Sequence, residues 1–205
     1  MARCARISVI YYSATGTTYE IAKEIVRGAE GSGAEVRLRR VSELAPAAAI
    51  ASKPAWSEHL AATRTVPVAS ADDVVWADGV IIGSPTRFGN VASQLKQFLD
   101  TLGPQWAKGL LAGKVYSGFT STDTQHGGQE STLLALYTTF YHFGGVVAAP
   151  GYTDPVKFVD GNPYGSAHVG RGHDLLESDG TSAVRAAARF QGERVARIAA
   201  AMQGL

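Results

Sequence analysis

The chain has 205 residues, and hydrophobic residues make up 45% of them, which is enough to build the core of one α/β domain. Lys and Arg total 19 against 18 Asp and Glu, and this net charge of +1 argues against a broad nucleic-acid or acidic-membrane surface. A single cysteine, Cys4, excludes an internal disulfide, and no apolar run is long enough to span a bilayer. We therefore expect a soluble cytoplasmic protein with no integral membrane segment and no nucleic-acid partner.

The first half of the sequence alternates β-forming runs with helical patterns. Thr17 and Glu20 have the spacing of a capping box at the start of the first helix. The Ala- and Pro-rich stretch at 43–71 shows weak periodicity, which predicts a loop-rich insertion. In chain order, the expected elements are a strand at 7–12, a helix at 18–30, a strand at 35–41, a short helix at 72–77 and a strand at 79–83.

The second half repeats this alternation. Residues 150–180 are rich in Gly, Pro, Asn and Asp, which predicts a turn-rich segment. The expected elements are a helix at 91–101, a strand at 114–119, a helix at 131–143, a strand at 146–149 and a long amphipathic helix at 181–202. Strands that alternate with helices predict a single α/β domain over 1–205. Its fold would be the flavodoxin-like, doubly wound one, with a five-stranded parallel sheet and helices on both faces.

The stretch SATGTT at 13–18 follows the first expected strand and leads directly into a helical pattern. A helix N-terminus presents unpaired N–H groups and a partial positive charge, and Gly16 lets the backbone approach an anion closely. Hydroxyl donors are added by Ser13, Thr15, Thr17 and Thr18. The stretch lacks the glycine patterns of NTPases and of dinucleotide-binding folds. It is therefore a candidate phosphate site, with a well-capped helix start as the alternative.

Two further loops follow expected strands and so lie at the same edge of a parallel sheet. SPTRFGN at 84–90 contains a stiffening proline, and its Phe88 could cover an aromatic ring. TSTDTQHGGQE at 120–130 offers hydroxyl, amide and glycine groups suited to a polyol or a ring edge. The alternative is a rigid turn with Phe88 in the core, and solvated side chains at Asp123 and His126. One phosphate site with two such loops favours a mononucleotide, and FMN fits best.

Several short sequence motifs, spread over nearly the whole chain, are informative when they are taken together. The most specific are PTRFGN at 85–90 and GGQE at 127–130, and the others include YYSATGTT, QLKQFLDTLGPQWAKGLLAGK, TTFYHFGG and NPYGSAHVGRG. Together they resemble the WrbA family of flavodoxin-like NAD(P)H:quinone oxidoreductases. The resemblance implies two-electron reduction of quinones by NADH or NADPH through FMN, with ping-pong kinetics. It also implies a homotetramer built as a dimer of dimers, and a role in oxidative stress.

The resemblance also assigns site residues by position. It implies that the FMN phosphate is held by Ser13, Ala14, Thr15, Gly16, Thr17 and Thr18. It places the isoalloxazine ring against Pro85, Thr86, Arg87, Phe88 and Gly89, and the ribityl chain and ring edge against Ser121, Thr122, Asp123, Thr124, Gln125, His126 and Gly127. His142 matches a histidine that contacts the flavin and orients it or delivers a proton. Trp106 matches a tryptophan that lines the nicotinamide and quinone pocket. No covalent catalyst and no metal site are expected.

Three positions depart from the family pattern. Relatives often have an aromatic residue at the position of Thr15, and it helps to bind the nicotinamide donor there. Threonine cannot stack on a ring in this way. The 121–128 loop is one residue longer and carries Asp123, whose negative charge would make reduced, anionic FMN harder to form. Phe143 replaces what is often a second histidine.

Other functions agree less well with the sequence. The main alternative is a flavin-binding electron-transfer or regulatory module without its own nicotinamide site, and Thr15 and Asp123 are what favour it. A transcription-factor partner would need a basic recognition helix, which the sequence lacks. His168 and His173 flank a Gly-Arg-Gly turn but have no closely spaced partners for a metal ion.

Overall fold

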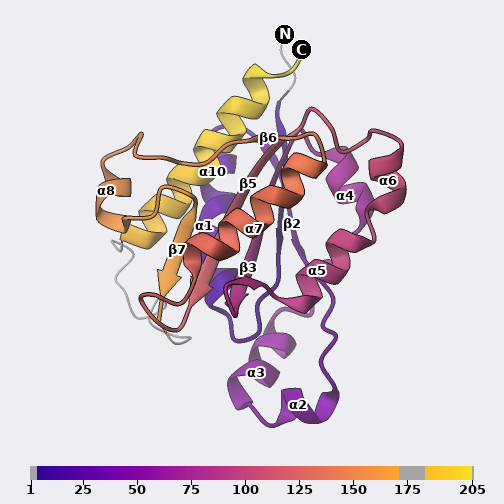
Figure 1. Cartoon of the computed structure of the whole chain (residues 1–205), viewed down its shortest axis with the longest axis vertical. Coiled ribbons are helices and arrows are strands. Elements are labelled where there is room, and N and C mark those ends of the chain that lie inside the picture. Colours follow the sequence, from indigo (N-terminus) through magenta and orange to yellow (C-terminus); the bar gives the residue numbers. More distant parts are fainter. Residues whose placement is uncertain (1–3, 171–182, 205) are drawn as a thin grey trace.

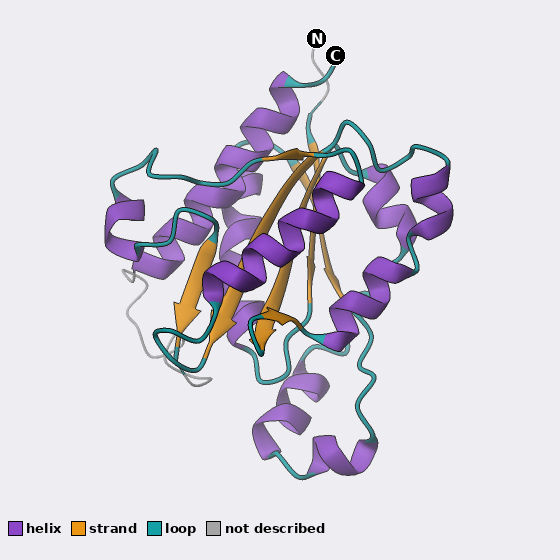
Figure 2. Ribbon diagram, viewed as in Figure 1, coloured by secondary structure: helices purple, strands orange, loops and turns teal. Residues whose placement is uncertain are grey.

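The structure is a computed structural model that describes residues 4–170 and 183–204 of the chain. A central sheet is covered by helices on both faces (Figures 1 and 2). Predictions for His173, for the 171–180 part of the turn-rich segment and for the first two residues of the final helix lie outside the described residues.

The sheet is built from parallel strands in the order β2-β1-β3-β5-β6. This order and the all-parallel path confirm the flavodoxin-like fold class. β1, β3 and β5 are almost wholly buried, as expected for strands covered on both faces. The strands are β1 (Arg6–Tyr11), β2 (Glu35–Arg40), β3 (Gly79–Arg87), β5 (Val115–Thr122) and β6 (Val146–Val147).

The last position of the sheet is shared by two short strands. β6 pairs with the start of β5, whereas β7 (Ser166–Val169) pairs with its end. Between them the chain leaves the sheet and forms α8 (Val156–Asp160), where Lys157 and Asp160 make a fully buried ion pair. The predicted strand at 146–149 is therefore shorter, and the turn-rich segment contains a helix and a strand. Both elements are too short to produce a readable periodicity.

α1 (Thr17–Gly31) and α10 (Ala183–Ala201) pack together on one face of the sheet. Two glycines let their backbones approach closely. A Cβ on Gly28 would lie 1.9 Å from the Arg189 carbonyl oxygen, and one on Gly192 would lie 2.0 Å from that of Ile25. Larger side chains at either glycine would therefore force the helices apart.

The opposite face carries the other core. The residues that pack there come from α4 (Ala71–Trp76), α5 (Ser93–Asp100) and α7 (Gln129–His142). The short helix α6 (Gly103–Ala107) follows α5. The two-residue strand β4 (Asn90–Val91) pairs antiparallel with the end of β3.

The prediction of a loop-rich stretch at 43–71 was wrong in part. It contains α2 (Ala47–Ala51) and α3 (Pro54–Ala62), which begins with proline at a position where proline is favoured. No residue of either helix is fully buried. These helices therefore do not need an apolar stripe, which explains why the sequence shows little periodicity.

The predicted capping box at Thr17 was also wrong. The N-cap of α1 is Gly16, whose φ of 106° is left-handed, and Thr17 already lies inside the helix. Glu20 forms an ion pair with Lys23 instead. A capping box does occur at α4, between Ser70 and Asp73. The glycine at the start of α1 leaves room for a ligand at the helix N-terminus.

Candidate functional site

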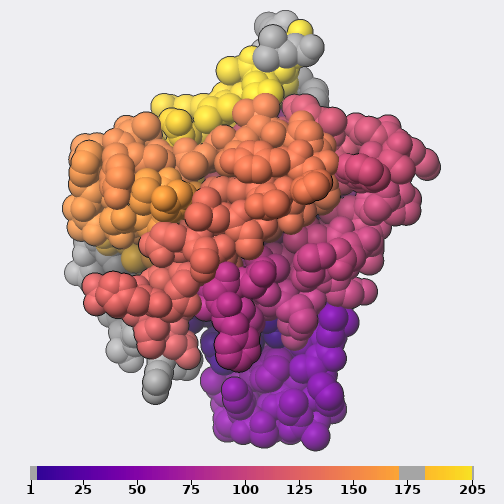
Figure 3. All heavy atoms as spheres, viewed as in Figure 1, coloured from indigo at the N-terminus to yellow at the C-terminus, as the bar shows by residue number. Residues whose placement is uncertain are grey.

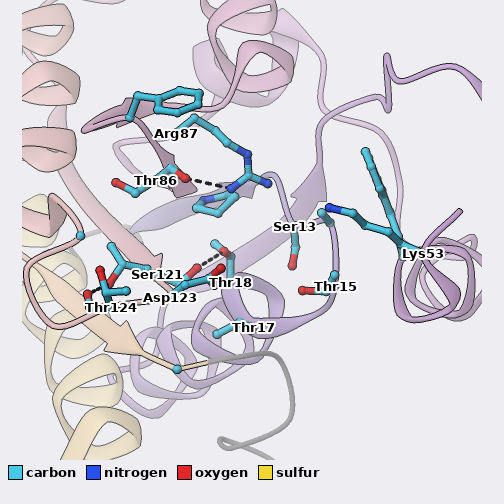
Figure 4. Close-up of a pocket in the computed structure, with 17 residues that line it drawn as sticks. Ser13, Thr15, Thr17, Thr18, Lys53, Thr86, Arg87, Ser121, Asp123 and Thr124 are labelled. Carbon is cyan, nitrogen blue, oxygen red and sulfur yellow. Dashed lines mark hydrogen bonds between the residues drawn. The ribbon is translucent and has the colours of Figure 1, made fainter. Parts of the chain in front are cut away.

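A cavity of about 670 Å³, called the main cavity below, lies at the carboxyl ends of β1, β3 and β5. Figure 3 shows the surface hollowed where the block of α2 and α3 meets the rest of the molecule. The three loops singled out by sequence contribute most of the lining (Figure 4). The lining residues are Ser13, Ala14, Thr15, Thr17, Thr18, Lys53, Trp56, Pro85, Thr86, Arg87, Phe88, Ser121, Thr122, Asp123, Thr124, Gly127 and Gly170.

The first loop is held in shape by its own hydrogen bonds. The Gly16 N–H donates to Ser13 Oγ at 3.1 Å, and the Glu20 N–H donates to the Gly16 carbonyl at 3.0 Å, which begins α1. The Thr18 hydroxyl is hydrogen-bonded to that of Ser121 at 2.9 Å, joining the first loop to the third (Figure 4). The positive end of a 15-residue helix thus points into a cavity rich in hydroxyl groups, which suits a phosphate.

The second loop is shorter than predicted, because part of the segment predicted as a turn belongs to a strand. β3 continues through Pro85, which pairs with Ser121 of β5, and then forms a hairpin with β4. The two hairpin residues, Phe88 and Gly89, have φ values of 54° and 75°. Both values match the turn type that two-residue hairpins favour, although a bulky residue at positive φ is uncommon. Phe88 is fully exposed rather than buried in the core.

The third loop follows the end of β5. The Thr122 hydroxyl donates to the Thr124 carbonyl at 2.9 Å, and the Gly127 N–H donates to the same carbonyl at 3.0 Å. A Cβ on Gly127 would lie 2.9 Å from that oxygen, so this tight bend needs glycine. The Thr86 hydroxyl donates to the Gly128 carbonyl at 3.1 Å, which ties the second loop to the third.

Most of the predicted cofactor contacts meet in this one cavity, but five do not line it: Gly16, Gly89, Gln125, His126 and His142. Gly16 shapes the first loop through its backbone, and Gly89 faces Ser131 in the hairpin turn. Gln125 and His126 are exposed on the outside of the third loop. The assignment of these residues by position remains a proposal.

Trp106 and His142 lie far from the main cavity of their own chain. They come from α6 and the end of α7, which lie near the amino ends of the parallel strands, at the end of the sheet opposite the main cavity (Figure 1). The indole N–H of Trp106 donates to the His142 carbonyl oxygen at 2.7 Å, and both side chains are exposed. The neighbouring Phe143 is buried against Tyr116, with ring centroids 5.9 Å apart. Within one chain, neither Trp106 nor His142 is brought to the predicted flavin site.

Two lining residues that sequence reasoning missed come from the segment read as loop. Lys53 precedes α3 and reaches toward the first loop (Figure 4), and Trp56 lies in the first turn of α3. A tryptophan three residues from a lysine in an otherwise Ala-rich stretch was the available signal. Lys53 supplies a cation at the edge of a phosphate site that has none in its own loop.

Trp56 is held in place by the carboxylate of Glu43. Glu43 Oε2 accepts hydrogen bonds from the indole of Trp56 and the hydroxyl of Tyr12, both at 2.9 Å. Its Oε1 accepts from the Gln94 amide at 2.7 Å. Burial alone would raise the pKa of Glu43, but hydrogen bonds from the Ala45 N–H, Gln94, Tyr12 and Trp56 hold it below its usual value. The charged carboxylate is thus the favoured form and the anchor of Trp56.

His59, one turn further along α3, packs against the first loop. Its ring lies 5.6 Å from that of Tyr19, centroid to centroid, and a Cβ on Gly16 would come within 3.5 Å of its Nδ1. Burial lowers the pKa of His59; the nearby Glu20 carboxylate acts in the opposite direction, and the charge of Lys23 lowers the pKa further. A neutral His59 is therefore part of the contact between α3 and the phosphate loop.

Over residues 4–170 and 183–204, His, Cys, Asp and Glu side chains form no group of three or more that could hold a metal ion. None of the helices in these ranges combines the length and the apolar character that a membrane span requires.

Comparisons with known proteins agree with this geometry. Residues 5–153 match the family model described as NADPH-dependent FMN reductase. A Deinococcus radiodurans protein named NAD(P)H dehydrogenase (quinone) is 42% identical over 200 residues, covering 97% of this chain and 98% of the relative. A Sinorhizobium fredii protein of the same name is 43% identical over 203 residues, covering 96% and 98%.

Solved structures show the same fold. A flavodoxin described as WrbA-like from Agrobacterium tumefaciens superposes with a TM-score of 0.66 at 23% identity, covering 95% of this chain and 97% of the other. An archaeal flavodoxin gives a TM-score of 0.61 at 15% identity, covering 95% and 98%. Together with the full-length relatives, these matches confirm the resemblance drawn from the sequence blocks. The chain belongs to the NADPH-dependent FMN reductase family, and relatives of more than 40% identity over nearly its full length are named NAD(P)H dehydrogenase (quinone).

Proposed function

We propose that this protein is an FMN-dependent NAD(P)H:quinone oxidoreductase that reduces quinones to hydroquinones. The observation that carries the proposal is the meeting of three loops, from β1, β3 and β5, in one cavity of about 670 Å³ at the carboxyl edge of a parallel sheet. The relatives of about 40% identity that are named NAD(P)H dehydrogenase (quinone) support the reaction.

The chemistry of the lining fits FMN. The N-terminal N–H groups of α1 and the hydroxyls of Ser13, Thr15 and Thr17 are donors suited to a phosphate monoester. The third loop offers hydroxyls along the path that a ribityl chain would take. The hairpin at 85–88 offers backbone groups and an exposed aromatic side chain for a flat ring. These neutral donors are joined by Lys53 at the edge of the cavity.

Bound FMN would supply the redox chemistry, the transfer of a hydride from a reduced nicotinamide and the reduction of a quinone by two electrons and two protons. The protein would supply position and electrostatics: the N-terminus of α1 would hold the phosphate, and the second and third loops, which are hydrogen-bonded to each other, would hold the ring. Because both substrates meet the same exposed face of the site, we expect them to bind in turn, which gives ping-pong kinetics. Asp123 places a carboxylate in the lining, and its charge would oppose the formation of an anionic reduced ring.

We further propose that Trp106 and His142 act in the main cavity of another copy of the chain. Both are exposed near the amino ends of the strands, opposite the cavity, so they can reach a flavin only if another copy of the chain packs against this end. There Trp106 would stack on the nicotinamide or quinone, and His142 would orient the ring or deliver a proton. This is consistent with the proposed homotetramer, a dimer of dimers, with each chain forming a single domain.

The proposed setting is the cytoplasm, where reduced nicotinamides are available. Because quinones would receive two electrons at once, one-electron quinone radicals would be avoided, which supports a role in oxidative stress.

Steady-state kinetics of the FMN-loaded protein with NADH or NADPH and benzoquinone test the proposal. We expect quinone reduction and double-reciprocal plots with parallel lines. No quinone reduction with either donor, while FMN is bound, would rule the proposal out. The alternative, an electron-transfer or regulatory module, is favoured by Asp123 in the cavity. It predicts slow reduction by NADH in stopped flow and accumulation of one-electron-reduced flavin during a reductive titration.

A further inference from the structure

A second hollow, called the side hollow below, adjoins the main cavity. It measures about 520 Å³ and lies between α3, the β3–β4 hairpin and the start of α5. It shares Trp56, Arg87 and Phe88 with the main cavity, so the two spaces border each other at these side chains. Its lining residues are Tyr12, Trp56, Arg87, Phe88, Asn90, Val91, Ser93, Gln94 and Lys96.

The charges and rings around the side hollow favour an aromatic anion. Trp56, Phe88 and Tyr12 are aromatic, and Arg87 and Lys96 are cations. No Asp or Glu is among the described residues that line the hollow. Lys96 pairs with Asp100 one turn further along α5, but its side chain remains more than half exposed. Phosphate groups and flat heterocycles are therefore the groups best recognised here.

The proposed reaction requires a binding region of this kind beside the main cavity. A nicotinamide donor is a dinucleotide, and only its nicotinamide ring has to lie on the flavin. With FMN in the main cavity, the ADP half of the donor has to extend beyond it. The side hollow borders the ring-binding hairpin and is large enough for a mononucleotide-sized group.

We infer that the side hollow binds the ADP half of the nicotinamide donor, an inference that rests on the proposed function. The adenine ring stacks on Trp56, and the pyrophosphate lies against Arg87 and Lys96. Trp56 is kept in place for this contact by its 2.9 Å hydrogen bond to Glu43. Glu43 is therefore a positioning residue for donor binding, while the hydride-accepting face of the site is built by other residues.

The test compares NADH with a truncated donor, N-benzyl-1,4-dihydronicotinamide, which has the reactive ring but no ADP half. For FMN-loaded wild type, W56A, W56F and K96E, the ratio of kcat/KM for NADH to that for the truncated donor is measured. In W56A we expect this ratio to fall roughly five- to one-hundred-fold, the range for loss of one base–aromatic stack. In W56F, which keeps an aromatic face, the ratio falls less. In K96E, an exposed charge reversal, it falls about two- to fivefold.

R197E is the matched control for K96E, because Arg197 is also an exposed helix cation paired four residues away, with Glu193 on α10. Its ratio is expected to equal that of wild type. In calorimetry, ADP-ribose should bind FMN-loaded wild type and bind W56A and K96E more weakly.

Three results would overturn the inference. One is an unchanged ratio in both W56A and K96E, and another is the absence of ADP-ribose binding to wild type. The third, no oxidation of NADH or of the truncated donor by FMN-loaded wild type, would remove the proposed function as well. A wild type that oxidises both donors, with variants that do not change the ratio, would remove the side hollow alone.

Discussion

The main cavity has two walls that are built in different ways. The loop wall, formed by the three loops at 13–18, 84–88 and 121–127, continues directly from buried strands and is tied together by backbone pairing and the Thr18–Ser121 bond. The α3 wall, formed by Lys53 and Trp56, belongs to helices with no buried residue and is anchored by the side chains of Glu43 and His59. The loop wall should therefore open only with global unfolding, whereas the α3 wall can loosen locally.

The largest effect should come from loosening the support of the loop wall. Glu24 of α1 is buried and forms ion pairs with Arg185 and Arg189 of α10. Replacing it with alanine removes the buried carboxylate that both cations contact and is expected to lower the free energy of unfolding by about 3 kcal/mol. Chemical denaturation measures this. The exposed Glu193→Ala, which also removes an ion pair on α10, should cost less than about 0.5 kcal/mol. Equal effects of the two substitutions would contradict the assignment.

Glu43→Ala should act mainly on the α3 wall. It removes the acceptor shared by Trp56, Tyr12 and Gln94 and is expected to cost about 1–2 kcal/mol. Hydrogen exchange should accelerate in residues 47–62 and stay unchanged in β1, β3 and β5. The control is Glu58→Ala, at an exposed position of α3. Uniformly faster exchange throughout the sheet would show that the two walls are not independent.

Thr18→Val tests how the loops are joined within the loop wall. It removes the hydroxyl bond to Ser121, and the affinity for FMN is expected to fall about two- to tenfold, as for one net hydrogen bond. Quenching of FMN fluorescence on binding gives the dissociation constant. Thr138→Val removes a comparable hydroxyl on the exposed surface of α7 and should leave FMN affinity unchanged. An unchanged affinity in the Thr18 variant would mean that the bond plays no part in the site.

The smallest expected effect is a pH dependence of the α3 wall. Burial lowers the pKa of His59 in the folded protein, so the unfolded chain, with a pKa near about 6.5, binds the proton more readily. The stability contributed by neutral His59 is therefore present above that value and is lost as pH falls through the folded pKa. The protection of residues 47–62 against exchange, taken relative to the intrinsic rate at each pH, should fall as the pH is lowered from about 7.5 to 5.5. In His59→Gln this loss of protection should be absent, and if it persists, another group is responsible.

The two walls also differ in how well the sequence predicted them. β1, β3, β5 and the loops after them were predictable because buried parallel strands are continuous apolar runs, and phosphate-binding turns need hydroxyl and glycine residues. α2 and α3 were not, because exposed helices need no apolar stripe. For the same reason the contributions of Lys53 and Trp56 were missed, since only the fold brings residue 56 beside residue 87.

Two other features depended on information beyond local pattern. The sharing of one sheet position by β6 and β7 arises because each pairs with a different part of β5, and both strands are too short to give a period. The distance of Trp106 and His142 from the main cavity of their own chain is a matter of topology, because α6 and the end of α7 lie at the opposite edge of the sheet. Motif matching named these residues but could not say which copy of the chain they would serve.

The most direct test of the central claim is the visible spectrum of the purified protein, recorded after addition of FMN, then NADH or NADPH, and then quinone. The account predicts a bound yellow flavin that bleaches with a nicotinamide donor and regains its colour with quinone. A protein that binds no FMN, or a bound flavin that neither donor bleaches, would contradict it.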